Sequence, residues 1–257
     1  MSETVPAKKK ASLPADAQLD RLVHDPAPEI LIAVAADLRL TEDLALALLN
    51  RRDLPPEALP ELNRNAAVAK LPKVQLALVA HPRTPRHVSV PLMRGLHTFE
   101  LKQIALQPAV AADVKRAAEE VLIGRLTSLS SGERLSLAKQ GSGRVAAALL
   151  TDKEERIVQA ALLNPQMTEM YIVKALKGET GTERLAPAVA HHTKWFHRTE
   201  VKAALLGNRN TPFARTVQIA ADLPLHALKD VLRNARLAPN VSKYLREVLA
   251  KRAGRIG

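Results

Sequence analysis

The sequence predicts an all-α protein built as an array of short stacked helices, an α-solenoid. Aromatic residues make up only 2% of the 257 residues, so the core must consist mainly of Leu, Ala and Val. Such a core favours helices over a β-sandwich or barrel. An Ala- and Leu-rich phrase recurs along the chain, and a turn follows almost every apolar segment. Hairpin signals, a dinucleotide-binding fingerprint and a P-loop are all missing from the sequence.

The beginning of the chain predicts a flexible basic tail followed by a single domain. Residues 1–12 are polar, contain three lysines and are interrupted by proline, whereas residues 13–257 carry the helical pattern. The apolar run Ile30–Ala36 is too short to cross a membrane, and no apolar run directly follows the lysines as in a secretory signal. We therefore expect a cytoplasmic protein without a membrane span. The absence of cysteine excludes disulfides, iron–sulfur clusters and a thiol nucleophile.

The recurring phrase predicts a helix, a sharp turn and a second helix. Its Val-x-x-Ala-Leu core places apolar side chains at i and i+4 on one helical face. The copies are Leu31–Leu44, Val74–Val88, Val158–Ile172, Val201–Val217 and Leu232–Leu245. The first and the last of these copies are more divergent than the other three.

Turn residues predict where these helices end and begin. Helices are expected to end at Pro82, Pro165, Pro239 and the Gly207–Asn208 pair. A hydroxyl residue ten positions after the first apolar residue is expected to cap the next helix, at Thr41, Thr84, Thr168, Thr211 and Ser242. Pro85 and Pro212 are expected at the first helical position. Ser130 and Glu133 match a capping box, and Ser142 a further cap.

The remaining segments look like degenerate copies, for example residues 101–114 and 145–157. Together the segments suggest an irregular array of roughly ten to sixteen short helices. Residues 177–182 (KGETGT) interrupt the pattern and are expected to form a loop within the array, or else a sub-boundary.

Three segments resemble the bacterial leucine-rich-repeat-variant family, a relative of HEAT-type helical repeats. They are Val201–Leu223 with its N-x-N-T-P turn, Val74–Leu96 with H-P-R-T-P, and Val158–Leu176 with N-P-x-x-T. The resemblance implies a right-handed superhelix with a surface used for binding, and it brings no catalytic residue. Some proteins of that family carry a cysteine-bound iron–sulfur module, which this cysteine-free chain lacks.

Charge gives the only hint about a partner. The net charge is +12, and residues 187–257 hold 13 basic and 4 acidic side chains. Such an excess attracts acidic protein, nucleic acid or acidic lipid, or else serves solubility alone. We expect an acidic protein partner, with nucleic acid as the alternative and no small-molecule cofactor.

Candidate binding residues gather at the turns and around the tryptophan. A ladder of cations along one edge of a stack would follow a phosphate backbone, whereas cations near helix C-termini also offset the helix dipole. The candidates are Arg83, Arg86, His87, Lys194, Trp195, Arg198, Arg209, Arg215, Arg233 and Arg236.

The segment around Trp195 allows three interpretations. Trp195 could stack on bases while its cationic neighbours meet phosphates, or it could fill the core between two helices. His191 or His192 with His197 and Glu200 would suit a metal by residue type but not by spacing.

Catalytic patterns do not rise above background, so we expect a non-catalytic scaffold. A HEAT-like DNA glycosylase would need a buried acid, Asp222 or Glu200, beside an exposed Trp195 in a basic groove. That enzyme is the competing hypothesis.

Overall fold

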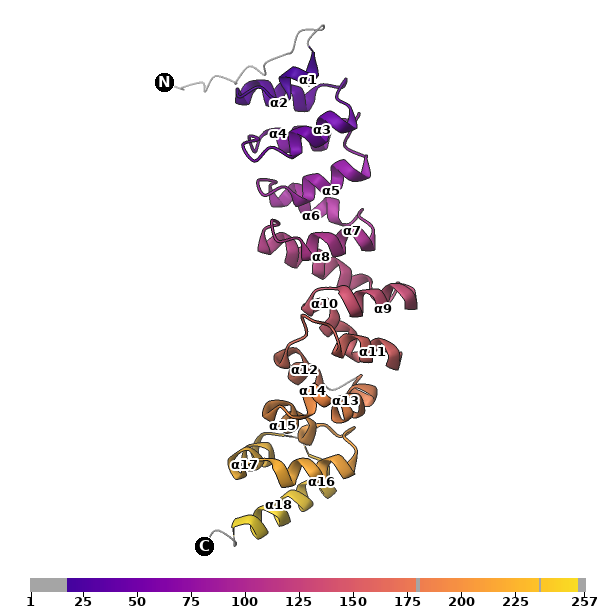
Figure 1. Ribbon diagram of the computed structural model, residues 1–257, viewed down its shortest axis with the longest axis vertical. Coiled ribbons are helices and arrows are strands. Elements are labelled where there is room, and N and C mark those ends of the chain that lie inside the picture. The colour runs from indigo at the N-terminus through magenta and orange to yellow at the C-terminus, as the bar shows by residue number, and fades with distance from the viewer. Residues whose placement is uncertain (1–17, 179–180, 236, 254–257) are drawn as a thin grey trace, which may run out of the picture. The chain divides into compact units, whose positions relative to one another are not determined.

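The computed structural model is all-helical. It describes residues 18–178, 181–235 and 237–253, and within these ranges it contains eighteen α-helices, one 3₁₀ helix and no strand (Figure 1). The number of helices exceeds the roughly ten to sixteen expected, because several are single turns. The expected basic tail, residues 1–12, lies outside the described residues.

The chain forms two compact units, residues 1–124 and 125–257. The expected single domain over residues 13–257 stays a prediction, and each unit is described by itself. The helices that belong to unit 1 are α1 (Leu19–Leu22), α2 (Pro28–Ala36), α3 (Glu42–Leu49), α4 (Ala58–Arg64), α5 (Pro72–Ala80), α6 (Arg86–Met93), α7 (Thr98–Leu106) and α8 (Ala112–Arg125), the last of which ends at the boundary.

Unit 2 contains the remaining helices. They are α9 (Ser131–Gln140), α10 (Gly143–Ala148), η1 (Leu149–Thr151), α11 (Glu155–Leu162), α12 (Glu169–Leu176), α13 (Thr182–His191), α14 (Thr193–Phe196), α15 (Thr199–Gly207), α16 (Phe213–Asp222), α17 (Leu225–Asn234) and α18 (Pro239–Ala253).

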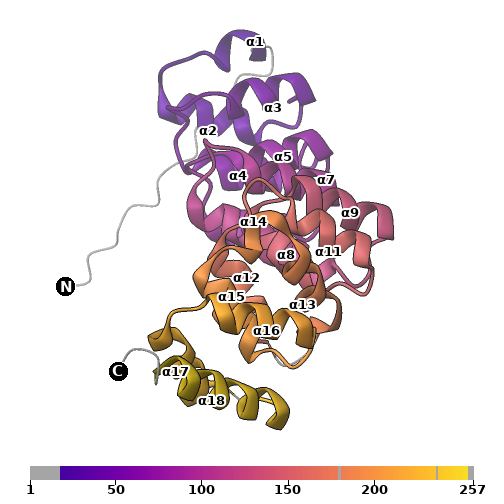
Figure 2. The ribbon, with the colours of Figure 1, turned by 60° about the horizontal axis from the view of Figure 1, so that its bottom comes forward.

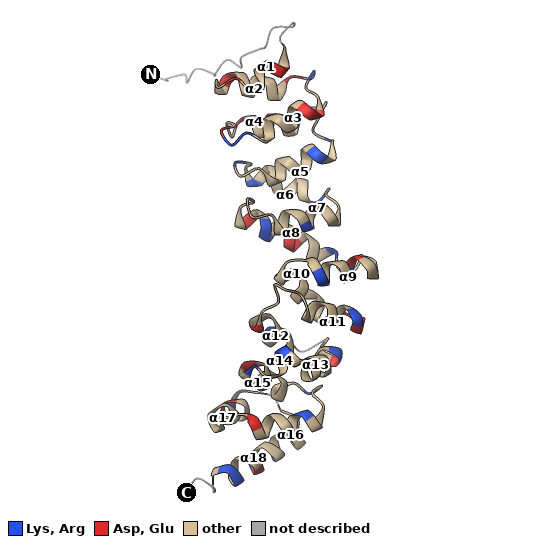
Figure 3. Ribbon diagram, viewed as in Figure 1, with Lys and Arg blue, Asp and Glu red and all other residues tan. Residues whose placement is uncertain are grey.

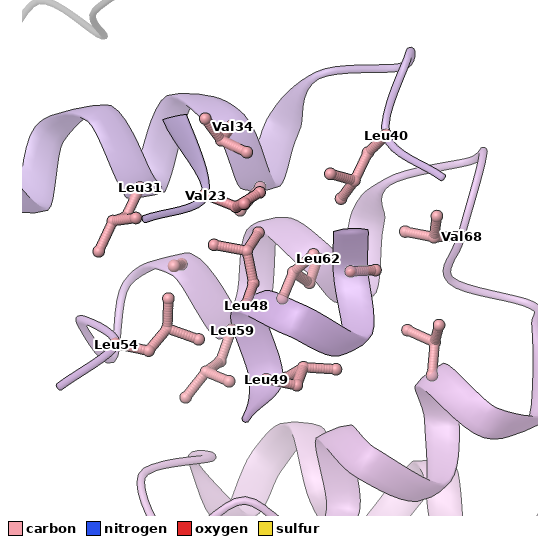
Figure 4. Packing of buried hydrophobic residues seen from close by; sticks show 14 of the residues in the cluster. Val23, Leu31, Val34, Leu40, Leu48, Leu49, Leu54, Leu59, Leu62 and Val68 are labelled. Atoms are coloured by element: carbon pink, nitrogen blue, oxygen red, sulfur yellow. The ribbon is translucent and has the colours of Figure 1, made fainter. Parts of the chain in front are cut away.

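In unit 1, helices pack on the helix two positions further along the chain. α2 lies against α4, and α3 lies against α5, which also contacts α7 (Figures 1 and 2). Leucine, valine and alanine side chains from α1 to α5 and their loops fill one continuous core (Figure 4). Leu48, Leu59 and Leu62 are completely buried in it, each contributing about 1.5–3 kcal/mol relative to an exposed position.

Unit 2 repeats this packing in two rows. One row runs α9, α11, α13, and the other runs α10, α12, α15, α17; α16 packs on α15 and α18. Residues 177–182 belong to this unit, and the buried Asn208 side chain bonds to both ends of that segment: its amide donates to the Leu176 carbonyl at 2.6 Å, and its oxygen accepts from the Thr182 hydroxyl at 3.5 Å. Small Ala residues and Leu again supply most of the core, as the composition predicts.

Three predicted caps are confirmed. Thr41 accepts from the backbone of the third residue of α3 at 3.4 Å. Ser130 and Glu133 form the reciprocal capping box that begins α9. Ser142 caps α10. These interactions connect residues three apart, so a local pattern is enough to find them.

The two Thr-Pro turns differ from the prediction. Thr84 and Thr211 do not cap the next helix; each hydroxyl donates 2.6 Å back to the carbonyl six residues earlier, in the preceding helix. Pro85 and Pro212 themselves occupy the N-cap, not the first helical position. The threonine therefore satisfies a carbonyl at the end of one helix, and the proline fixes the extended backbone before the next.

The two other expected caps also differ. Thr168 stands at the N-cap of α12, but its side chain makes no capping hydrogen bond. Ser242 lies inside α18, and Pro239 begins that helix where we expected a helix to stop. Proline suits the first turn because its missing N–H has no intrahelical partner there.

Buried asparagines tie together helices that pack on each other but are two or three helices apart in the chain. Each asparagine stands at or just after a helix end, accepts from the N–H two residues later, and donates to a carbonyl at the end of a helix 23 to 32 residues earlier. The three are Asn65, bonded to Ala35 and Asp37; Asn164, bonded to Ala138 and Gly141; and Asn208, bonded to Leu176. They satisfy carbonyls that a helix end otherwise leaves without partners.

Other donors close further helix ends in the same way. They are Arg51 to Val23 and Asp25, Trp195 to Leu162, and Arg252 to Ala220 and Leu223. The sequence predicted a helix stop at the Gly207–Asn208 pair and assigned no role to Asn65 or Asn164. Their role depends on partners about thirty residues away, which local pattern does not reveal.

In the turn after α5, His81 occupies the position that asparagine has in the other turns. Its Nδ1 accepts from the Arg83 N–H at 3.2 Å, so Nε2 must donate to the Arg51 carbonyl at 3.0 Å. The neutral ring satisfies both partners, and a protonated ring would direct an N–H at an N–H. Burial lowers the pKa of His81, and the Arg83 cation lowers it further.

We expect His81 to make unit 1 less stable in mild acid. Because its folded pKa is lowered, the unfolded chain binds the proton more readily, so stability falls as the pH drops below about 6.5. His81→Asn keeps both hydrogen bonds but removes the titrating ring. The chemical denaturation midpoint of this variant, measured by circular dichroism, should therefore change less between pH 7.5 and 5.5 than that of the unchanged protein. This pH range is set around the ordinary histidine pKa of about 6.5. The control is His87→Asn, which replaces an exposed histidine. Equal pH dependence in both variants would contradict the assignment.

Candidate macromolecule-binding surface

Positive charge is concentrated in unit 2. Residues 125–257 contain 22 Lys and Arg against 11 Asp and Glu, whereas residues 1–124 contain 16 against 15. In unit 2 the cations are spread over many helices (Figure 3). Three of the eleven acids, Asp152, Glu154 and Asp222, already pair with cations inside the unit. Nearly all of the protein's net charge therefore belongs to unit 2.

Three candidates lie in unit 1, in and after the turn between α5 and α6. Arg83, Arg86 and His87 are all exposed. Arg83 donates at 3.4 and 3.3 Å to the carbonyls of Asp53 and Leu54. The structural alternative, a cation that satisfies backbone carbonyls, accounts for Arg83. It does not account for Arg86, which is the first residue of α6 and so stands at the positive end of a helix dipole.

Trp195 lies in the core. Its side chain is 3% exposed, and its indole N–H donates 2.9 Å to the Leu162 carbonyl. The Lys194 ammonium lies 4.2 Å from the ring centroid. Base stacking by Trp195 is therefore wrong for this structure, and so is the exposed tryptophan that the glycosylase hypothesis required. The indole N–H closes the end of α11 instead.

The other cations of unit 2 do not form one ladder. Arg198 is the N-cap of α15 and Arg209 follows its C-cap, so a nine-residue helix of about 13 Å separates them. Arg215 is half-buried, with its guanidinium 5.1 Å from the Phe196 centroid, and Arg233 is in the last turn of α17. Arg236 lies outside the described residues. Exposed Lys194, Arg198, Arg209 and Arg233 enter none of the ion pairs found among the described residues.

A comparison of equivalent turns confirms that the basic residues do not occupy equivalent positions. The N-caps Pro85, Thr168 and Pro212 each follow four residues after His81, Asn164 or Asn208. Arg83 stands two residues after its turn's first member, but Arg209 stands one residue after. Stacked turns therefore do not present cations at equivalent places.

A groove of about 1040 Å³ runs beside α15 in unit 2. The small residues Ala203, Ala204 and Gly207 of α15 form part of its lining and fill little of the space beside this helix. Its charged lining is mixed, with Lys177, Glu200, Arg209, His226 and Asp230. Of the candidate residues only Arg209 lines it, so the groove and the basic surface are different features.

The histidines beside Trp195 form no metal centre in the described part of the chain. No group of three or more His, Asp or Glu there could hold a metal ion. His191 Nδ1 contacts the Pro187 carbonyl at 2.8 Å, and His192 Nδ1 accepts from the Lys194 N–H at 3.2 Å. Burial lowers the pKa of His192, with the Lys194 charge as a second cause. His192 thus repeats one of the two contacts of His81, the bond from the N–H two residues later.

The sequence analysis missed an exposed apolar face on α16. Phe213 is 49% exposed and Val217 is 37% exposed, one helical turn later. Phe213 makes an edge contact with Tyr244 of α18, with centroids 5.7 Å apart. The i, i+4 spacing of the two residues was the available signal, but such spacing ordinarily indicates a core face.

Comparisons with known proteins find no matching family model, no matching curated protein and no matching solved structure. The resemblance to leucine-rich-repeat variants therefore stays a prediction. Among the helices of the described residues, none is long and apolar enough to span a membrane.

Proposed function

We propose that this protein is a non-catalytic helical-repeat scaffold, an α-solenoid of HEAT-like or variant leucine-rich repeats, that binds an acidic macromolecule through unit 2. The helical rows and the side chains that bond to helix ends about thirty residues earlier support the repeat architecture. A helix array fixed by such bonds presents its exposed side chains in a constant arrangement.

The charge of unit 2 carries the proposal about the partner. Twice as many cations as acids belong to this unit, and four of its exposed cations enter none of the ion pairs in the described part of the unit. Positive charges concentrated on one unit repel one another. Binding of an acidic partner that covers them is therefore favoured. We propose a protein partner, since the tryptophan available for base stacking is buried.

Fluorescence anisotropy with labelled polyglutamate tests the proposal. We expect binding to weaken steeply between ~50 and ~200 mM salt. Replacing Lys194, Arg198, Arg209 and Arg233 with Ala should weaken binding about tenfold or more at the lower salt concentration. Labelled duplex and single-stranded DNA and RNA are measured in parallel.

A matched control separates local from total charge. Replacing the exposed Arg21, Arg52, Lys70 and Arg116 of unit 1 with Ala removes the same number of positive charges. This control should bind polyglutamate as the unchanged protein does. Equal losses in both variants, or no binding of polyglutamate, would overturn the proposal. Binding of nucleic acid in preference to polyglutamate would overturn the protein partner.

A further inference from the structure

The exposed face of α16 is apolar, unlike those of the next two helices. Its exposed residues are Phe213, Ala214, Val217, Gln218 and Ala221, followed by Asp222 at the helix end. Residues 213, 217 and 221 are spaced four apart and so form one stripe along the helix. The exposed residues of α17 and α18 include Lys229, Arg233, Lys243 and Arg246.

Tyr244 extends this stripe onto α18. The half-buried ring contacts Phe213 at one end of α16, and Arg252 donates to the Ala220 and Leu223 carbonyls at the other end. The two helices therefore run side by side in the same direction. Phe213, Val217 and Tyr244 together form an apolar surface of two adjacent helices, which we call the α16 face.

Two cations, Arg215 and Lys251, and one exposed carboxylate, Glu247, lie next to the α16 face. Arg215 donates 2.7 Å to Gln218, which is exposed next to Val217 on α16, while its guanidinium lies 5.1 Å from the centroid of the Phe196 ring. Lys251 is exposed and stands seven residues after Tyr244, on the same side of α18. The carboxylate at the end of α16, Asp222, is already bonded to the Lys202 ammonium at 3.0 Å.

We propose that the α16 face binds an amphipathic helix of an acidic partner protein. Apolar side chains of such a helix would cover Phe213 and Val217, and its carboxylates would meet Arg215 and Lys251. A second copy of unit 2 would bring together two bodies with the same positive excess, which opposes pairing of the face with itself. This inference rests on the proposed function and names the place and shape of the partner.

A labelled designed peptide of about 18 residues, with Leu spaced three and four apart and Glu elsewhere, tests the proposal. A scrambled peptide of the same composition and a peptide with Lys in place of Glu are the comparisons. We expect the acidic amphipathic peptide to bind about tenfold or more tightly than either. Equal binding of the scrambled peptide would show charge attraction alone and would overturn the α16 face, while leaving the proposed function in place.

Variants locate the binding. Phe213→Ser with Val217→Ser should weaken binding of the acidic peptide about tenfold or more, with an unchanged circular dichroism spectrum. The matched control is Leu163→Ser with Met170→Ser, because those side chains are 72% and 70% exposed elsewhere in unit 2. Equal effects of the two variants would overturn the proposal. Binding of oligothymidylate that is lost in the Phe213→Ser and Val217→Ser variant would also overturn the proposal, because the α16 face would then bind nucleic acid bases.

Discussion

Replacing Arg134 with Ala is expected to lower the free energy of unfolding of unit 2 by about 3–5 kcal/mol. The Arg134 side chain is 9% exposed and donates from all three nitrogens: to Asp152 at 2.8 Å, to Glu154 at 2.6 Å and to the Leu129 carbonyl at 2.8 Å. Asp152 is equally buried, at 8%. Removing the guanidinium leaves that carboxylate in a place with little water and no cation.

Glu154 shares the network from its more exposed side. Its second oxygen accepts from Ser131 at 2.6 Å and from Arg156 at 2.9 Å. The hydrogen bond from Ser131, and then that from Arg156, hold the pKa of Glu154 below its ordinary value. Its contribution is therefore present at neutral pH and lost as the pH falls through the carboxyl range.

Trp195 allows this prediction to be measured in unit 2 alone. It is the only tryptophan and is buried in that unit, so its emission during denaturation with urea reports the unfolding of unit 2. Arg156→Ala is the control: this arginine is 63% exposed, and its loss should cost less than about 1 kcal/mol. Similar midpoints for the two variants would contradict the role assigned to Arg134.

A second variant separates the buried charge from the lost packing. Arg134→Met with Asp152→Leu removes both members of the most buried ion pair and replaces them with apolar side chains of similar volume. The double variant should recover part of the loss, because no uncompensated carboxylate is left at residue 152. A double variant less stable than Arg134→Ala would show that packing, not charge, dominates.

Local patterns predicted much of the helical fold. The helix class followed from a Leu, Ala and Val composition, and the capping box at Ser130 followed from two residues three apart. The turns at Pro82 and Pro165 also follow helix ends. In each case the interacting residues are close in sequence, so the pattern contains the physical cause.

Partners outside the expected local pattern explain where the sequence predictions were wrong or left open. Thr84 looked like a cap for the next helix, but the carbonyl of Leu78 was the partner its hydroxyl reached. Trp195 could be placed only once Leu162, 33 residues earlier, was seen to accept from it. The charge excess of the C-terminal part was visible in the sequence. Which cations share a face depends on the helix stacking.

The asparagines give the second large prediction, because their bonds connect helices that are distant in sequence. Asn164 is 2% exposed; its amide donates to Ala138 at 2.9 Å and to Gly141 at 3.0 Å, and its oxygen accepts from the Gln166 N–H at 2.8 Å. Asn164→Ala removes two buried hydrogen bonds and one partly buried one at once. We expect a loss of about 2–4 kcal/mol in the free energy of unfolding, since the stranded backbone groups cannot reach water.

Asn164→Asp tests whether the amide donor is the cause. Aspartate has the same shape, but it places a carboxylate oxygen against two carbonyl oxygens, so at neutral pH it should destabilise unit 2 more than alanine does. Asn234→Ala, at an exposed asparagine of the same unit, should change stability by less than about 0.5 kcal/mol. Denaturation midpoints from circular dichroism and Trp195 emission rank the three variants. An Asn164→Asp protein as stable as the unchanged chain would mean that α9 and α11 are held together by apolar packing alone, and that the recurring asparagine has no part in joining helices that pack on each other.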